Sequence, residues 1–107
     1  MTTSAEFQAL FQRGKRIDRP SLIVLWSPTG GPSRAGFAVS RQIRGAVPRN
    51  RVRRRLREAY RAARSEAPGG TALVVIGKPA ALSGAFEALV VDMREALRAV
   101  SGPRPPA

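Results

Sequence analysis

Cysteine and histidine are both absent from this chain of 107 residues. Without cysteine, disulfide bonds and thiolate metal sites are excluded. Without histidine, the commonest general base is missing, and so is a frequent zinc ligand. Long apolar runs are also missing, because no stretch reaches the roughly eighteen residues of a membrane span, and no signal-peptide pattern opens the chain. We therefore expect a soluble, cytoplasmic protein.

Acidic residues are scarce as well. The chain has 7 Asp plus Glu against 19 Lys plus Arg, which gives a formal net charge of +12. Such an excess indicates a polyanionic partner, with nucleic acid first and an anionic membrane surface second. Hydrophobic residues make up 43% of the chain, which favours folding over disorder. The length suits one domain over residues 1–107, with residues 1–3 and 101–107 frayed.

Hydrophobic periodicity predicts the order helix, two strands, basic helix, strand, helix. The expected segments are a first helix Ser4–Gln12, strands Ser21–Trp26, Arg34–Ser40 and Thr71–Gly77, and a last helix over Leu82–Val100. The first two strands are expected to pair as neighbours, and the third to be central. This pattern predicts an α/β (α+β) two-layer fold, in which helices cover at least one face of a small sheet. Sheet order and crossover handedness stay open.

The basic helix holds most of the arginine. The stretch "AVPRNRVRRRLREAYR", residues 46–61, contains seven arginines and one acid, Glu58. Pro48 suits a first helical turn, and "PGG" at residues 68–70 ends the segment. One apolar stripe is formed by Val52, Leu56, Ala59, Tyr60 and Ala63. Arg54, Arg57 and Arg61 lie opposite that stripe on a helical wheel.

A solvated helix face would explain a mixed charge pattern, but this pattern is nearly all positive. Arg53, Arg57 and Arg61 are like-charge neighbours at i, i+4, which weakens a helix. Arg49 and Arg51 lie near the helix N-terminus, where the macrodipole disfavours cations. A bound polyanion removes each of these penalties, and arginine forks onto phosphate in a bidentate manner. The sequence therefore predicts a nucleic-acid-binding helix.

Several motifs together resemble the protein subunit of bacterial ribonuclease P. Its hallmark is an RNR box followed by a basic helix, and here the box is Arg49, Asn50 and Arg51. The segments "EFQALFQRGKR", "GFAVSRQI" and "VVIGKPAA" are similar to the family's opening helix, to its glycine-containing strand and to its last strand with a Lys-Pro turn. The chain departs from the family pattern at Arg44, Gly45 and Gly77.

The resemblance implies a division of labour between protein and RNA. In this family the RNA subunit carries the catalytic centre and removes the 5′ leader of precursor tRNA. No protein side chain is expected to be catalytic, and Mg²⁺ is expected to be held mainly by the RNA subunit and the substrate. The implied partners are the catalytic RNA and the leader, with no membrane and no protein partner required. The implied fold is a sandwich with a left-handed βαβ crossover.

The resemblance also implies two sets of site residues. The expected RNA-binding residues are Arg41, Arg49, Asn50, Arg51, Arg53, Arg54, Arg57 and Arg61. On composition alone, Asn50 could equally be an ordinary polar residue of the first turn. The expected leader-binding cleft is formed by Phe7, Phe11, Ile23 and Leu25. Aromatic faces can stack on unpaired bases, although two Phe at i, i+4 are more often core. For Ile23 and Leu25, a place in the strand core fits as well as a place in the cleft floor.

Other classes of protein remain as alternatives. A structural RNA-binding protein, such as a small ribosomal protein, would share the basic helix without a leader cleft. A DNA-binding helix fits less well, because the run has neither helix-turn-helix spacing nor a zipper. A stand-alone nuclease fits least, since no two of the seven acids form a metal-binding cluster in the sequence.

Overall fold

A mixed sheet of four strands organises the molecule. The computed structural model describes residues 15–28, 34–66 and 70–101. Its strands are β1 (Lys15–Asp18), β2 (Leu22–Pro28), β3 (Arg34–Val39) and β4 (Thr71–Gly77), and they lie in the order β1-β2-β4-β3. The β1–β2 and β2–β4 pairs are antiparallel, whereas β3 and β4 are parallel. The expected α+β class with one small sheet is confirmed, and the sheet is mixed.

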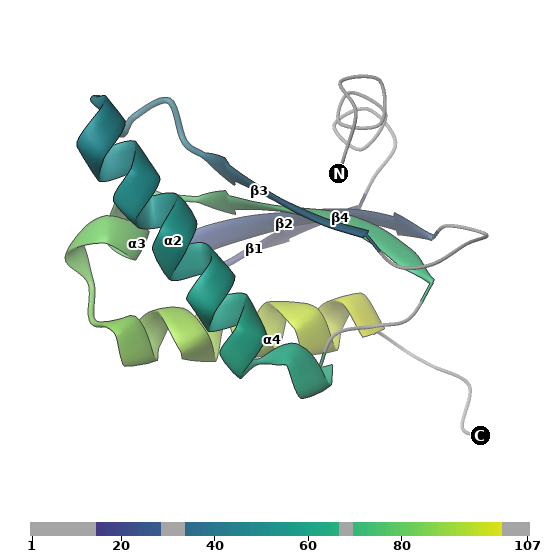
Figure 1. Ribbon diagram of the computed structural model, residues 1–107. Coiled ribbons are helices and arrows are strands. Elements are labelled where there is room, and N and C mark those ends of the chain that lie inside the picture. Colours follow the sequence, from purple (N-terminus) through teal and green to yellow (C-terminus); the bar gives the residue numbers. More distant parts are fainter. Residues whose placement is uncertain (1–14, 29–33, 67–69, 102–107) are drawn as a thin grey trace.

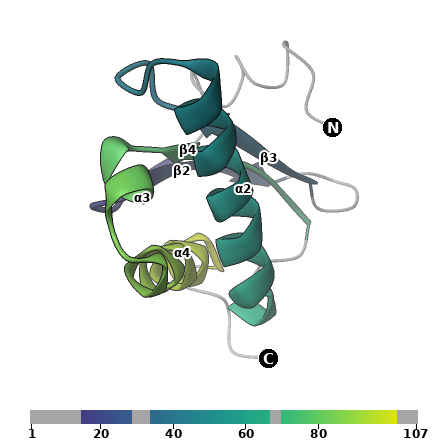
Figure 2. The same ribbon diagram turned by 60° about the vertical axis from the view of Figure 1, so that its left-hand side comes forward.

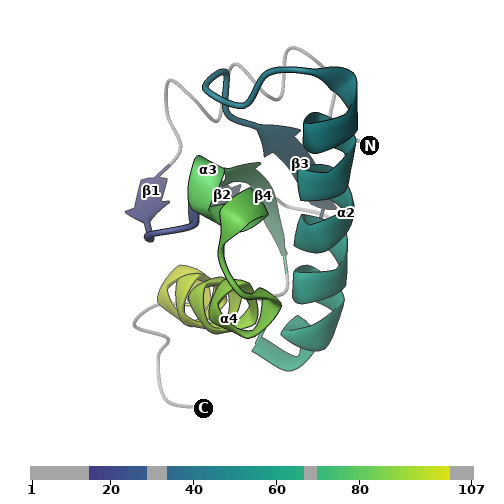
Figure 3. The same ribbon diagram turned by 90° about the vertical axis from the view of Figure 1, so that its left-hand side faces the viewer.

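The described helices all cover the same face of the sheet (Figures 1 and 3). They are α2 (Ala46–Ala62), the 3₁₀ turn η1 (Arg64–Glu66), α3 (Pro79–Ser83) and α4 (Phe86–Ser101). α2 packs on β3 and β4, while α4 packs on β1 and β2. None of these helices is long and apolar enough to cross a membrane.

The strand β4 is central because both of its faces are apolar. Alternate residues of a strand face opposite sides. Leu73 and Val75 belong to the large core cluster under the helices, whereas Val74 belongs to a smaller cluster on the other face. The helices contribute to the large cluster the buried side chains Val52, Leu56, Ala59, Leu89, Met93 and Leu97.

The end of β4 lies unusually close to α2. A Cβ added at Gly77 would lie 2.5 Å from Cγ1 of Val52 and 3.1 Å from Cδ1 of Leu56. A larger residue there would force the helix away from the sheet, because interiors are packed without spare volume. Gly77 therefore sets how closely the basic helix approaches the sheet.

The turn between β1 and β2 is tied to α4 by polar contacts. The carboxylate of Asp92, which is buried, accepts hydrogen bonds from N–H of Ser21 at 3.0 Å and from its hydroxyl at 2.5 Å. Arg19 lies 3.5 Å from the same carboxylate and donates to Glu95 at 2.7 Å. These contacts fix the β1–β2 hairpin against the helical layer.

The expected pairing of the first two strands was wrong. The predicted segments correspond to β2 and β3, but β4 lies between them and pairs with both. A central position suits β4, since a strand buried on both faces is stabilised most when it has neighbours on both sides. Adjacency in sequence favoured a β2–β3 hairpin. The structure instead places β4, which is apolar on both faces, between these two strands.

Two further differences are a strand that was missed and a helix that is broken. β1 was not predicted, because only Ile17 of its four residues is even half-buried. The last helix is broken into α3 and α4 at Gly84, where an added Cβ would lie 2.7 Å from the carbonyl oxygen of Ala80. The predicted first helix, Ser4–Gln12, lies outside the described residues.

Candidate nucleic-acid interface

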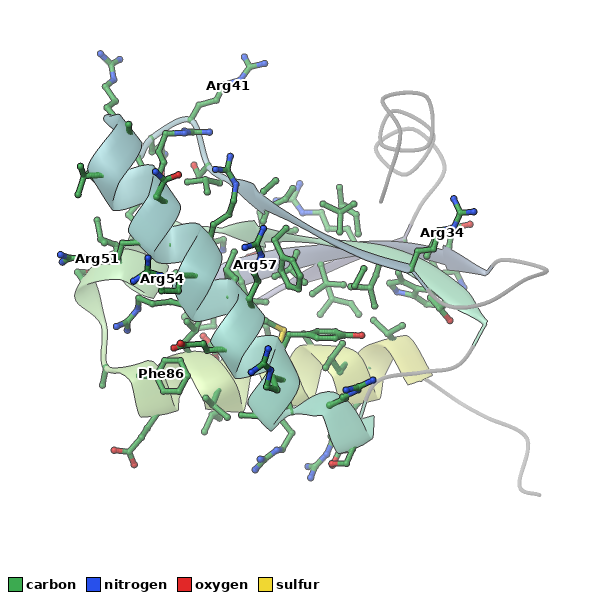
Figure 4. All side chains as sticks on the ribbon, viewed as in Figure 1. Arg34, Arg41, Arg51, Arg54, Arg57 and Phe86 are labelled. Atoms are coloured by element: carbon green, nitrogen blue, oxygen red, sulfur yellow. The ribbon has the colours of Figure 1, made fainter. Side chains whose placement is uncertain are left out.

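The outer side of α2 carries a row of arginines. Val52, Leu56 and Ala59 set the orientation of the helix because they are buried. We call the four exposed arginines of α2 the arginine face: Arg51, Arg54, Arg57 and Arg61. Within residues 15–28, 34–66 and 70–101, no carboxylate forms an ion pair with any of the four. The arginine face is thus a cationic surface without an acidic partner in the described part of the chain, and Figure 4 labels three of its members, Arg51, Arg54 and Arg57.

Several cations outside α2 have acidic partners. Lys78 and Arg16 both bind Asp18, and their hydrogen bonds, that of Lys78 first, hold the pKa of this carboxyl below its usual 3.8. Arg98 of α4 pairs with Glu66 at 3.2 Å. The positive charge is therefore least compensated along α2, where seven arginines accompany one glutamate.

Asn50 and Arg53 contact each other on the same helix. Nη1 of Arg53 donates to Oδ1 of Asn50 at 3.4 Å, a long hydrogen bond between exposed groups. Asn50 also borders a shallow surface hollow with Val47, Arg51 and Arg54. An exposed amide beside guanidinium groups can hydrogen-bond the edge of a base or a sugar. The RNA-binding role of Asn50 remains a prediction.

Two arginines of α2 are turned inward instead. Arg55 donates from Nε to the carbonyl of Ala81 at 2.8 Å and from Nη2 to the carbonyl of Gly84 at 2.7 Å. Its guanidinium carbon also lies 5.7 Å from the ring centroid of Phe86. Arg55 therefore ties α2 to the turn between α3 and α4, which lies beside it (Figure 2).

Arg49 is the second inward arginine, although the RNR box placed it among the expected RNA contacts. Its guanidinium donates to the backbone carbonyls of Val39 at 3.3 Å, Ser40 at 3.1 Å and Ile43 at 2.9 Å. Sequence patterns carried no signal for this arrangement, because the acceptors are carbonyls of a loop that any residue type provides.

The loop that Arg49 contacts presents cations of its own. Ile43 is buried, whereas Arg41 and Arg44 are exposed. Arg41 projects near the start of α2 (Figure 4). Arg41 was among the predicted RNA-binding residues, and Arg44 was not. Its closeness to Arg41 in the same short loop is the sequence signal that could have added Arg44 to the candidates.

The residues of the predicted leader cleft are only partly described. Phe7 and Phe11 lie outside the described residues. Ile23 and Leu25 share the face of β2 that no described helix covers, next to Val74. Ile23 is half-buried and Leu25 is 6% exposed, so Ile23 is the more accessible of the two. Trp26 is partly buried and packs against the main core.

The comparisons with known proteins all identify the same family. A family model described as Ribonuclease P matches residues 1–101. The ribonuclease P protein component of Gluconacetobacter diazotrophicus is 42% identical over 97 residues, covering 88% of this chain and 84% of the relative. That of Kocuria rhizophila is 41% identical over 98 residues, covering 91% and 87%. The structure of the RNase P protein from Thermotoga maritima superposes with a TM-score of 0.80 at 26% identity, covering 91% of this chain and 93% of that one.

Proposed function

This chain belongs to the ribonuclease P protein family, and we propose that its arginine face is the surface through which it binds the catalytic RNA. The chain is the protein subunit of ribonuclease P, which processes the 5′ end of precursor tRNA. The observation that carries the proposal is the row of exposed arginines with no acidic partner among the described residues.

The proposed physical role of the arginine face is to reduce repulsion between two polyanions. The RNA subunit and the precursor tRNA must lie side by side, and both carry one phosphate charge per nucleotide. Guanidinium groups displace condensed cations from phosphates and release them to solution, which drives binding at moderate salt. Arg51, Arg54, Arg57 and Arg61, with Arg41, Arg53 and Asn50 beside them, form the proposed contact set. The catalytic RNA and the precursor tRNA are the proposed partners.

The protein is not proposed to supply a metal site. Among residues 15–28, 34–66 and 70–101, no three acidic side chains are grouped closely enough to hold a metal ion. The described side chains therefore offer no all-protein cage for Mg²⁺. We propose that Mg²⁺ is bound by the RNA subunit and by substrate phosphates, with which it prefers to share its coordination shell. The cytoplasm, where tRNA is made, is the proposed location.

For the fold, we propose that the β3–α2–β4 connection has the left-handed sense that the family resemblance implies. β3 and β4 are parallel neighbours and α2 connects them, so the unit is a crossover whose hand is a defined property. A right-handed sense is the general rule for such units. The strand order fixes β3 as the edge strand, so the hand of this unit determines which face of the sheet α2 and its arginine face cover.

We further propose that the leader runs over the sheet face that no described helix covers. Ile23 and Leu25 provide the apolar floor on β2, and Phe7 and Phe11 provide aromatic rings that stack on unpaired bases. An apolar floor with stacking rings binds single-stranded nucleotides without reading their sequence. This suits a leader that differs from one precursor tRNA to the next.

Reconstitution tests the proposed function directly. The purified chain alone, with Mg²⁺ present, is expected to leave precursor tRNA intact. Addition of the cognate ribonuclease P RNA is expected to give release of the 5′ leader, faster than the RNA gives alone. Gel analysis of end-labelled precursor tRNA measures both. Cleavage that tracks with the protein after micrococcal-nuclease treatment would contradict the division of labour. Tighter binding of ribosomal RNA than of ribonuclease P RNA would favour a structural RNA-binding protein instead.

Substitution of Phe7 and Phe11 by alanine tests the leader cleft. Because aromatic stacking contributes about 1–3 kcal/mol per base, the double variant is expected to weaken holoenzyme binding of precursor tRNA but not of mature tRNA. Phe37→Ala is the matched control, since Phe37 packs edge-on against Tyr60 with ring centroids 5.6 Å apart. The control should lower thermal stability without distinguishing the two tRNA forms. A large loss of stability in the double variant, with equal loss of affinity for both tRNAs, would place the two rings in the core instead.

A further inference from the structure

The loop between β3 and α2 has a defined conformation built from backbone contacts. N–H of Ser40 donates to the carbonyl of Gly77 at 2.9 Å, which extends the parallel pairing by one residue beyond β3. N–H of Ile43 then donates to the carbonyl of Ser40 at 3.1 Å, and the side chain of Ile43 is 5% exposed. The loop ends at Gly45, whose φ of +94° lies in the left-handed region that favours glycine. Between these fixed points stand the exposed Arg41 and Arg44.

Arg49 closes this loop from the first turn of α2. Nη1 binds the carbonyls of Ser40 and Ile43, and Nη2 binds that of Val39. The three acceptors belong to the end of β3 and to the loop, so a single guanidinium joins strand, loop and helix. Hydrogen bonds from a charged donor are stronger than neutral ones, and the fork of arginine matches several acceptors at once. Three carbonyl dipoles also offset the cost of a cation near the start of a helix.

We propose that Arg49 is a positioning residue and not itself an RNA contact. It holds the loop so that Arg41 and Arg44 stand next to the arginine face and meet the same RNA. The proposal rests on the proposed RNA-binding function. It reassigns the first arginine of the RNR box from the RNA to the protein's own backbone. Arginine is required at this position because the single ammonium group of lysine cannot span acceptors on both sides of the loop.

Salt dependence of RNA binding, measured in two backgrounds, separates positioning from direct contact. The probe is the cognate ribonuclease P RNA, and the loop-neutral background is Arg41→Gln with Arg44→Gln. In the wild-type background, Arg49→Gln is expected to lower the log–log salt slope by up to about 1.4–1.8, because two loop contacts are misplaced, at about 0.7–0.9 each. In the loop-neutral background the same substitution is expected to leave the slope unchanged. A direct phosphate contact would lower the slope by about 0.7–0.9 in both backgrounds, which would overturn the proposal.

Two further variants keep the test decisive. Arg49→Lys retains the charge, so a phosphate contact would survive it, whereas positioning predicts a loss close to that of Arg49→Gln. Arg55→Gln is the matched control, because it too removes hydrogen bonds from a guanidinium to backbone carbonyls, here two of them at the α3–α4 turn. Trypsin treatment of the free protein should cut after Arg41 and Arg44 faster in Arg49→Lys than in Arg55→Gln. Equal cutting rates would overturn the proposal without any RNA present.

The same data distinguish failure of this inference from failure of the proposed function. If the loop-neutral variant binds RNA like wild type, Arg41 and Arg44 make no RNA contact, and the positioning role of Arg49 is wrong. That result leaves the proposed function untouched, because substitutions in the arginine face test it separately. If substitution of the arginine face also leaves binding unchanged, the proposed function itself falls.

Discussion

Replacing all four residues of the arginine face by glutamine is expected to lower the log–log salt slope of RNA binding by about 3, at about 0.7–0.9 per contact. At 0.1 M salt this corresponds to a loss of affinity on the order of a thousandfold, because each unit of slope contributes about tenfold there relative to 1 M. The reason is that these guanidinium groups are exposed and have no carboxylate partner in the described part of the chain, so the proposed RNA phosphates would be their anionic partners. Titration of labelled ribonuclease P RNA at several salt concentrations measures the slope.

The matched control for the arginine face is a set of paired cations. Arg16→Gln and Arg98→Gln remove the same charge from residues whose partners are Asp18 and Glu66. These two variants are expected to change the slope little. The thermal midpoint of the quadruple variant should stay the same or rise, because like-charge neighbours on one helix repel each other. A quadruple variant whose slope equals that of wild type would show that the arginine face is only solvated.

Truncation of Leu56 to alanine has the second large expected effect, on stability and not on RNA contacts. Leu56 is fully buried and belongs to the cluster that joins α2 to the sheet. Loss of a buried leucine side chain costs about 2–5 kcal/mol of unfolding free energy, because a cavity remains. For a domain of this size that lowers the thermal midpoint by about 8 °C or more. Circular dichroism during heating and denaturant titration both measure it.

Arg54→Ala is the control for this substitution, since Arg54 is exposed two residues earlier on the same helix. It should leave the thermal midpoint nearly unchanged while reducing the salt slope by one contact. Leu56→Ala, measured below its melting temperature, should keep the wild-type slope. The reverse pattern, with Arg54 controlling stability and Leu56 controlling RNA binding, would contradict the orientation of α2.

The parts of the fold that the sequence predicted are those set by local pattern. The basic helix was predicted because apolar spacing at Val52, Leu56 and Ala59 and the arginine run agree on one orientation. β4 was predicted with its observed bounds, Thr71–Gly77, because its residues are apolar on both faces. Strand order was not predicted, since pairing is made by backbone groups that all residues share. The short β1 was not predicted for a different reason, because only one of its four residues, Ile17, is half-buried and no apolar pattern marks it.

The candidate site likewise has a part that local pattern predicted and a part that it did not. Exposure of Arg54, Arg57 and Arg61 follows from helical geometry alone, and the structure agrees with it. The inward turn of Arg49 and Arg55 could not be predicted, because it depends on carbonyl groups of segments that only the folded chain brings near. An arginine-rich helix thus contains both arginines that stabilise the fold and exposed arginines; helical spacing identifies exposed ones, but it does not identify Arg49 and Arg55 as turned inward.

The absence of cysteine permits a direct measurement of which surface meets the RNA. Val47 of α2 and Val91 of α4 are the two exposed large apolar side chains among the described residues, 72% and 51% exposed. Val47→Cys and Val91→Cys each give a protein with a single thiol, to which the same photo-cross-linker is attached. In the reconstituted holoenzyme, the probe at residue 47 is expected to cross-link strongly to ribonuclease P RNA, and the probe at residue 91 weakly. Equal cross-linking from both positions, or stronger cross-linking from α4, would contradict the assignment of the arginine face as the RNA-binding surface.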